Sequence, residues 1–210
     1  MIKKWGLNLE ESEEVRELPA LKPSADILTS EGSIRSIDNT VFFYSSVGVI
    51  ECADLNRILR EIDTRLRLAK EIMDAESFTP TIHLRINSYG GDLFAGLSVV
   101  DTIRSLSSNV YTYVEGAAAS AATLISVCGK KRFIGKNSFM LVHQLSSISG
   151  GTFEQLEDNH ENNKRLMSLI KSVYKQYTKI PMKDVDNILK RDIWWDSAEC
   201  LKHGMIDEII

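Results

Sequence analysis

Residues 81–92 read Thr-Ile-His-Leu-Arg-Ile-Asn-Ser-Tyr-Gly-Gly-Asp and give the strongest indication of the fold. The side chains of residues 81–86 alternate in the manner of a β-strand. The residues that follow, Gly90 and Gly91 among them, favour a turn. Apolar side chains then recur at helical spacing at Leu93, Leu97, Val100 and Ile103. The stretch therefore predicts a strand, a turn and a helix in succession.

The same pattern continues on both sides of this stretch. We expect further strands at 40–44, 110–114, 132–134 and 139–142, and amphipathic helices at about 53–75 and 152–177. Strands that alternate with helices predict βαβ units. The expected fold class is therefore α/β with a mainly parallel sheet.

Residues 1–38 differ from the rest of the chain. They are polar and acidic, contain Pro19 and Pro23, and show no sustained periodicity. We expect an N-terminal extension here that is mobile or ordered only against a neighbour. Residues 39–210 are predicted to form one domain, and a chain of 210 residues is long enough for a substantial core.

Composition argues against several classes of partner. A formal net charge of −4 gives no reason to expect nucleic acid or an anionic membrane. No apolar run approaches the ~18–20 residues of a membrane span, and the N-terminus does not have the pattern of a secretory signal. Cys52, Cys128 and Cys200 are odd in number and widely spaced, which favours free thiols in a reducing compartment. We expect a cytoplasmic protein without a metal site.

Residues 116–122 read Gly-Ala-Ala-Ala-Ser-Ala-Ala and place a hydroxyl among very small side chains. A strand followed by such a run puts Ser120 at or near a helix N-terminus, where unpaired N–H groups and the helix dipole stabilise an oxyanion. His143 and Asp192 complete the three side-chain types of nucleophilic acyl transfer. Taken singly, each has a structural alternative: a tightly packed helix for Ser120, a structural histidine, and a surface ion pair for Asp192.

Five short motifs occur together in a known order. They are Ser88-Tyr89-Gly90-Gly91, Gly116-Ala117-Ala118-Ala119-Ser120, Leu141-Val142-His143-Gln144, Arg191-Asp192 and Gly204-Met205-Ile206-Asp207. Through them, roughly residues 39–210 resemble the ClpP family of serine peptidases, within the wider ClpP/crotonase fold. The resemblance implies a superhelix of βαβ units with a mainly parallel sheet and a protruding handle helix.

The resemblance also implies roles for individual residues. Ser120 corresponds to the nucleophile, His143 to the general base and Asp192 to the residue that orients the imidazole. The oxyanion donors correspond to the backbone N–H groups of Gly91 and Ala121.

Further residues take their expected roles from the same resemblance. Ser88, Tyr89 and Gly90 correspond to the neighbourhood of the substrate strand, in which Tyr89 stands in place of the usual proline. Arg191 corresponds to an inter-ring contact, with a surface salt bridge as its alternative.

The implied activity is that of a serine endopeptidase. It would cleave unfolded proteins or short peptides through an acyl-enzyme on Ser120, without a cofactor. The implied partners are like subunits in a self-compartmentalising ring, either a heptamer or stacked heptamers, and a Clp-type ATPase. Three alternatives remain: a phage-type head-maturation peptidase of the same fold, a non-catalytic ClpP-like ring subunit, and a crotonase-like acyl-CoA enzyme.

Overall fold

The computed structural model describes residues 34–73 and 77–210. Most of the expected extension at 1–38 therefore lies outside the described residues. Its last part is described and contains the strand β1, Ile34–Ile37, which pairs with the next strand. No sequence pattern indicated β1, because it lies in the segment that shows no sustained periodicity.

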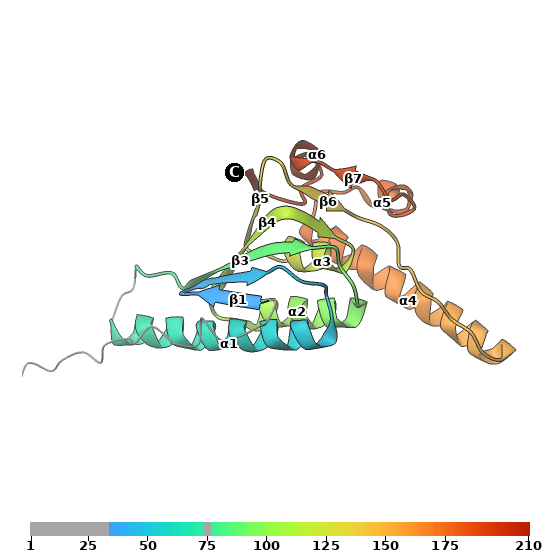
Figure 1. The fold of residues 1–210 in the computed structure, drawn as a ribbon. Helices are drawn as coiled ribbons and strands as arrows, with labels where there is room; N and C mark the ends of the chain where they lie inside the picture. Colours follow the sequence, from blue (N-terminus) through green and yellow to red (C-terminus); the bar gives the residue numbers. More distant parts are fainter. Residues whose placement is uncertain (1–33, 74–76) are drawn as a thin grey trace, which may run out of the picture. The chain divides into compact units, whose positions relative to one another are not determined.

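The described residues form an eight-stranded sheet and six helices (Figure 1). The strands are β1 (Ile34–Ile37), β2 (Thr40–Phe43), β3 (Thr81–Ser88), β4 (Asn109–Ala119), β5 (Lys131–Ile134), β6 (Phe139–Leu141), β7 (Trp194–Trp195) and β8 (Glu208–Ile209). The helices are α1 (Val49–Ile72), α2 (Leu93–Ser105), α3 (Ala121–Val127), α4 (Phe153–Tyr177), α5 (Met182–Leu189) and α6 (Ser197–Lys202).

The strand order is β1-β2-β3-β4-β5-β8, and β6 joins β4 to β7 outside this path. The pairs β1–β2 and β6–β7 are antiparallel, and the other pairs of strands are parallel. The prediction of a mainly parallel α/β sheet is confirmed. Helix α1 begins at Val49, four residues before the predicted start, directly after the extended Gly48.

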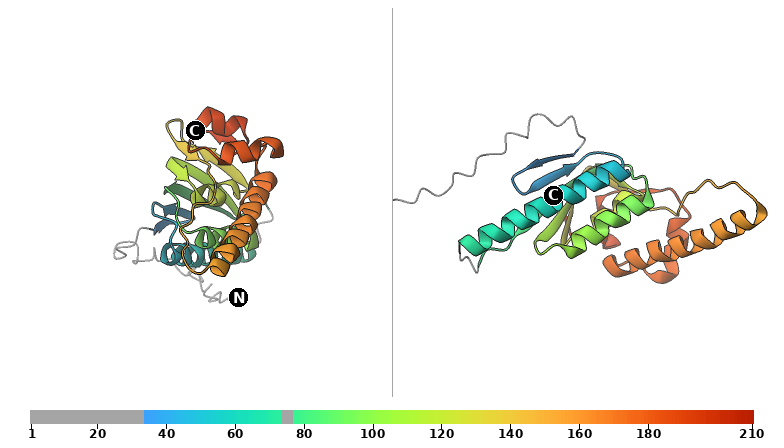
Figure 2. Two further views of the ribbon diagram at one scale, coloured as in Figure 1. Left: turned by 90° about the vertical axis from the view of Figure 1, so that its right-hand side faces the viewer. Right: turned by 90° about the horizontal axis from the view of Figure 1, so that it is seen from below.

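One face of the sheet is covered by α1, α2 and α3 (Figures 1 and 2). Ile82, Leu84 and Ile86 of β3 are fully buried, and so are Leu55 and Leu59 of α1. Each such side chain contributes about 1.5–3 kcal/mol when it leaves water. The alternating side chains of residues 81–86 therefore point in turn to the covered face of the sheet and to its other face.

Helix α4 is attached to this core only near its C-terminal end. Ile170, Val173 and Tyr174 are its buried residues, and most of the helix is exposed. Its N-terminal part extends away from the sheet (Figure 1), which agrees with the expected protruding handle helix.

The course of β4 differs from the prediction. We expected a strand at 110–114, before Gly116, but β4 continues through Gly116 to Ala119. Gly116 adopts φ +82°, and its N–H donates to the Ser138 hydroxyl at 2.8 Å. Before this kink β4 pairs with β5, and after it with β6. Gly116 is therefore the point at which the strand changes its partner, and a side chain would disfavour the required backbone conformation.

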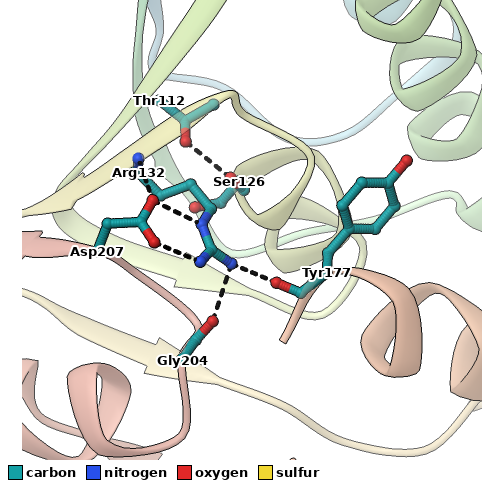
Figure 3. Close-up of polar contacts among 6 residues, drawn as sticks. All are labelled: Thr112, Ser126, Arg132, Tyr177, Gly204 and Asp207. Atoms are coloured by element: carbon teal, nitrogen blue, oxygen red, sulfur yellow. Dashed lines mark hydrogen bonds and ion pairs between the residues drawn. The ribbon is translucent and has the colours of Figure 1, made fainter. Parts of the chain in front are cut away.

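A cluster around Arg132 ties the C-terminal segments to the sheet (Figure 3). The guanidinium binds Asp207 through two nitrogens, at 2.6 and 3.0 Å, and donates to the carbonyl groups of Tyr177 and Gly204. Such a two-pronged ion pair fixes both groups in orientation. Arg132 thereby joins β5, the end of α4 and the segment that leads to β8.

None of the helices in the described ranges has the combination of length and hydropathy that a membrane span needs.

Candidate active site

Ser120 lies at the junction of β4 and α3 in an unusual backbone conformation. Its φ of 55° and ψ of −128° are rarely adopted by a residue with a side chain, at a cost of about 1–3 kcal/mol. Its N–H donates to the Leu141 carbonyl at 2.9 Å, and its own carbonyl accepts from the Thr123 N–H and hydroxyl. The predicted position at a helix N-terminus is confirmed, and the strained turn presents the side chain at the end of the strand.

Gly90 packs directly against this turn. A Cβ atom at Gly90 would lie 2.5 Å from the Ala119 carbonyl oxygen and 2.6 Å from Ser120 Cβ. Gly90 also adopts φ +90°, which favours glycine. The Gly90-Gly91 turn therefore brings two backbones close together, and the other backbone is that of the serine turn.

Gly91 pairs with Val47 in an isolated parallel bridge, and no sequence motif indicated Val47. The Val47 N–H donates to the Gly90 carbonyl at 2.9 Å, and the Asp92 N–H donates to the Val47 carbonyl at 2.7 Å. In a parallel pairing, one residue bonds to the two neighbours of its partner, and the partner's own N–H points the other way. Here Val47 bonds to the two neighbours of Gly91, so the Gly91 N–H points away from Val47. A bridge of one residue leaves no repeating pattern in the sequence, so nothing pointed to Val47.

Two backbone donors remain free beside Ser120. Ala121 is the first residue of α3, where an N–H has no partner within the helix. Within the described parts of the chain, neither the Gly91 N–H nor the Ala121 N–H donates a hydrogen bond. The site of a Gly90 Cβ atom lies only 3.2 Å from the Ala121 nitrogen, so the two segments are adjacent.

The register of three strands brings the candidate triad together. Ala119 of β4 is opposite Leu141 of β6, and Leu141 is opposite Trp194 of β7. Ser120 follows Ala119. Because β6 and β7 are antiparallel, the residue two places after Leu141 faces the residue two places before Trp194. These residues are His143 and Asp192.

The contact between His143 and Asp192 is long. His143 Nδ1 lies 4.0 Å from Asp192 Oδ1, beyond hydrogen-bond distance, and the Asp192 side chain is 79% exposed. Among the described residues, the Ser120 hydroxyl makes no hydrogen bond to His143. Catalytic hydrogen bonds are often long in enzymes without substrate, so the His143–Asp192 distance fits a resting site.

The other predicted residues have distinct surroundings. The Ser88 hydroxyl is buried and accepts from the Gly90 N–H at 3.2 Å, so it stabilises the turn. Tyr89 is largely exposed and meets Trp194 edge to face at 6.0 Å between ring centroids. Arg191 is exposed, and the surface salt bridge suggested as its alternative role is not formed with any described residue.

Metal ligands and reactive thiols do not cluster in the part of the chain that is described. No group of three or more His, Cys, Asp or Glu residues there could hold a metal ion. The three cysteines are buried and unpaired. Burial raises the pKa of Cys52 to about 11 and that of Cys128 and Cys200 to about 12. A thiolate nucleophile is therefore disfavoured, because the thiolate is the reactive form.

Comparison with known proteins identifies the family. The family model described as Clp protease matches residues 60–210. The chain belongs to the Clp protease family. This is a family of serine endopeptidases with the ClpP-type fold.

Individual relatives agree with this assignment. An ATP-dependent Clp protease proteolytic subunit from Streptococcus mutans is 39% identical over 143 residues, which cover 66% of this chain and 72% of the relative. The protein of the same description from Streptococcus uberis is 35% identical over 146 residues, with the same coverage. The structure of a ClpP1 mutant from Listeria monocytogenes matches the fold with a TM-score of 0.71 at 22% identity, covering 82% of this chain and 91% of that one.

Proposed function

We propose that the protein cleaves peptide bonds with Ser120 as nucleophile, His143 as general base and Asp192 as the residue that orients His143. His143 takes the hydroxyl proton as Ser120 Oγ attacks the substrate carbonyl carbon, and it then protonates the leaving amine. Water, activated by the same imidazole, releases the acyl group from Ser120.

The backbone N–H groups of Gly91 and Ala121 stabilise the oxyanion in this proposal. Both are free of other partners in the described structure, and they come from two segments in contact at Gly90. Loss of one oxyanion donor typically costs about 10²–10³ in rate. The glycines and alanines thus allow two backbones to approach one reacting carbonyl.

One observation carries the proposal: the strand register that sets His143 opposite Asp192, beside the strand that ends at Ser120. A surface ion pair or a structural histidine needs no strained serine next to it. Ser120 retains its unfavourable φ between two free N–H donors, as a nucleophile would require.

Substrate and assembly complete the proposal. An extended substrate would lie along the Gly90-Gly91 segment, beside Tyr89. The family relationship supports a homo-oligomeric ring, heptameric or of stacked heptamers, with Arg191 as an inter-ring contact. The name of the relatives, proteolytic subunit of an ATP-dependent protease, supports a Clp-type ATPase as partner. The unpaired buried cysteines support a cytoplasmic location.

The test is intact-protein mass spectrometry after treatment with a fluorophosphonate, with native mass recorded on the same samples. Wild type should gain one adduct in an oligomer, and Ser120→Ala should gain none and lose peptidase activity by about 10⁴-fold or more. Ser126→Ala is the matched control, because Ser126 lies in α3, the helix that follows Ser120, and its buried hydroxyl has no hydrogen-bond partner among the described residues. An active Ser120→Ala protein would refute the proposal, and an unlabelled but fully assembled wild type would favour the non-catalytic ring subunit.

A further inference from the structure

A buried pair of hydroxyl groups connects the handle helix to the candidate nucleophile. The Thr123 hydroxyl oxygen lies 2.6 Å from the Ser120 carbonyl oxygen and 2.6 Å from the Tyr174 hydroxyl oxygen. Thr123 is fully buried, and Tyr174 is 2% exposed. Tyr174 is also one of the few buried residues of α4. The contact therefore joins α4 to the serine turn inside the core.

Proton counting gives the direction of these bonds. The Ser120 carbonyl can only accept, so Thr123 must donate its one hydroxyl proton to it. Tyr174 must then donate to Thr123. Burial raises the pKa of the Tyr174 phenol far above its ordinary value, so the phenol keeps the proton that it donates. The chain of bonds runs from Tyr174 to Thr123 to the Ser120 carbonyl.

The Ser120 carbonyl belongs to the same peptide unit as the Ala121 N–H. A peptide unit is planar, and in its trans form the C=O and N–H bonds point in opposite directions. A hydrogen bond that fixes the carbonyl therefore also fixes the direction of the N–H. It also polarises the unit, because hydrogen bonds in series strengthen one another.

We infer that Thr123 and Tyr174 are positioning residues that hold the Ala121 N–H toward the reacting carbonyl. The inference rests on the proposed function, because it gives the Ala121 N–H the role of an oxyanion donor. Neither side chain touches the substrate. They lower the free energy of the transition state, in which the oxyanion develops, and do not change the binding of substrate.

The test compares three variants in the assembled protein with a fluorogenic peptide substrate. Thr123→Val keeps nearly the shape of threonine but removes the hydroxyl. Its kcat should fall about 10-fold with KM unchanged, which is less than the loss in rate of about 10²–10³ for a missing oxyanion donor. Tyr174→Phe should lose less, about 2–5-fold, because Thr123 can still donate. Thr123→Ser keeps a hydroxyl at the same position and should retain most of kcat.

The double variant Thr123→Val/Tyr174→Phe measures whether the two residues act together. Its kcat should equal that of Thr123→Val alone, since both side chains act through one hydrogen bond. It also replaces a hydrogen-bonded pair by an apolar pair of similar shape, so it keeps the core filled if Thr123→Val alone fails to fold. Losses that multiply, or that appear in KM, would overturn the inference.

A peptide boronate separates positioning from a merely structural effect. A boronate forms a tetrahedral adduct on serine, so its affinity for Thr123→Val and for Tyr174→Phe should fall by the same factor as the kcat of that variant. When either substitution is added to Ser120→Ala, the affinity for a substrate peptide should stay constant. The failure of the two proposals looks different. If Ser120→Ala is active, the proposed function is wrong. If Ser120→Ala is inactive and Thr123→Val has wild-type kcat and boronate affinity, only the positioning role is wrong.

Discussion

Gly90→Ala is the substitution for which the structure gives the sharpest expectation. The added Cβ would lie 2.5 Å from the Ala119 carbonyl oxygen and 2.6 Å from Ser120 Cβ. Carbon atoms in contact prefer about 3.5–4.0 Å, so the serine turn and the glycine turn must separate by about 1 Å. The neighbouring atoms are backbone or a Cβ, which cannot rotate away as the end of a flexible side chain can.

The expected magnitude has two parts. Alanine at φ +90° costs about 1–2 kcal/mol, and overpacking of this kind costs about 1–3 kcal/mol. The free energy of unfolding should therefore fall by about 2–5 kcal/mol, which lowers Tm by at least about 4 °C in a domain of this size. A displacement of about 1 Å at the nucleophile should lower kcat/KM by about 10².

Gly150→Ala is the matched control. A Cβ at Gly150 meets no atom of the described residues within 4 Å, and the φ of Gly150 lies outside the left-handed region. Its stability should change by no more than about 0.5 kcal/mol. The assays are thermal unfolding, hydrolysis of a fluorogenic peptide and the rate of fluorophosphonate labelling. If Gly90→Ala melted and reacted like wild type, the packing of the glycine turn against Ser120 would be wrong.

Three further predictions concern charge and thiol chemistry. The hydrogen bond from Arg132 holds the pKa of Asp207 below its ordinary value of 3.8, so its stabilising contribution is complete above about pH 4 and is lost as the pH falls through the folded-state pKa. The difference in Tm between wild type and Asp207→Asn should therefore be larger at pH 7 than at pH 3, and an equal difference would contradict this. In the native protein at pH 8, the three buried cysteines should not react with a disulfide reagent, and in guanidinium all three should react. A fast reaction of the native protein would contradict their burial. Asp192→Asn should lower kcat by less than the ~10⁴-fold seen for a buried triad aspartate, because Asp192 is 79% exposed and lies 4.0 Å from the imidazole. Steady-state kinetics measures this, and a loss of kcat equal to that of Ser120→Ala would refute it.

Much of the fold could be predicted because its signals are local. The alternation in residues 81–86 and the apolar spacing in α2 record which side of each element is covered. In α4 the apolar spacing predicts the helix, but only its C-terminal part is buried. The strands β7 and β8 were not predicted, because two residues carry no period, and β1 was not predicted because its segment shows no sustained periodicity. The end of β4 was misplaced because a glycine commonly ends a strand. At Gly116 it instead permits a change of partner within a continuous strand.

The residues of the candidate site differ in how far the sequence could predict them. Gly91, Ser120 and His143 follow the carboxyl ends of β3, β4 and β6, and these ends meet at one edge of a parallel sheet. Asp192 reaches the same place through the two-residue strand β7, whose register no local pattern encodes, so only the family motif pointed to it. Thr123 and Tyr174 are 51 residues apart and belong to no motif. Nothing in the sequence of α4 shows that the hydroxyl of its buried Tyr174 bonds to Thr123, beside the serine turn. That link exists only once α4 has packed against α3.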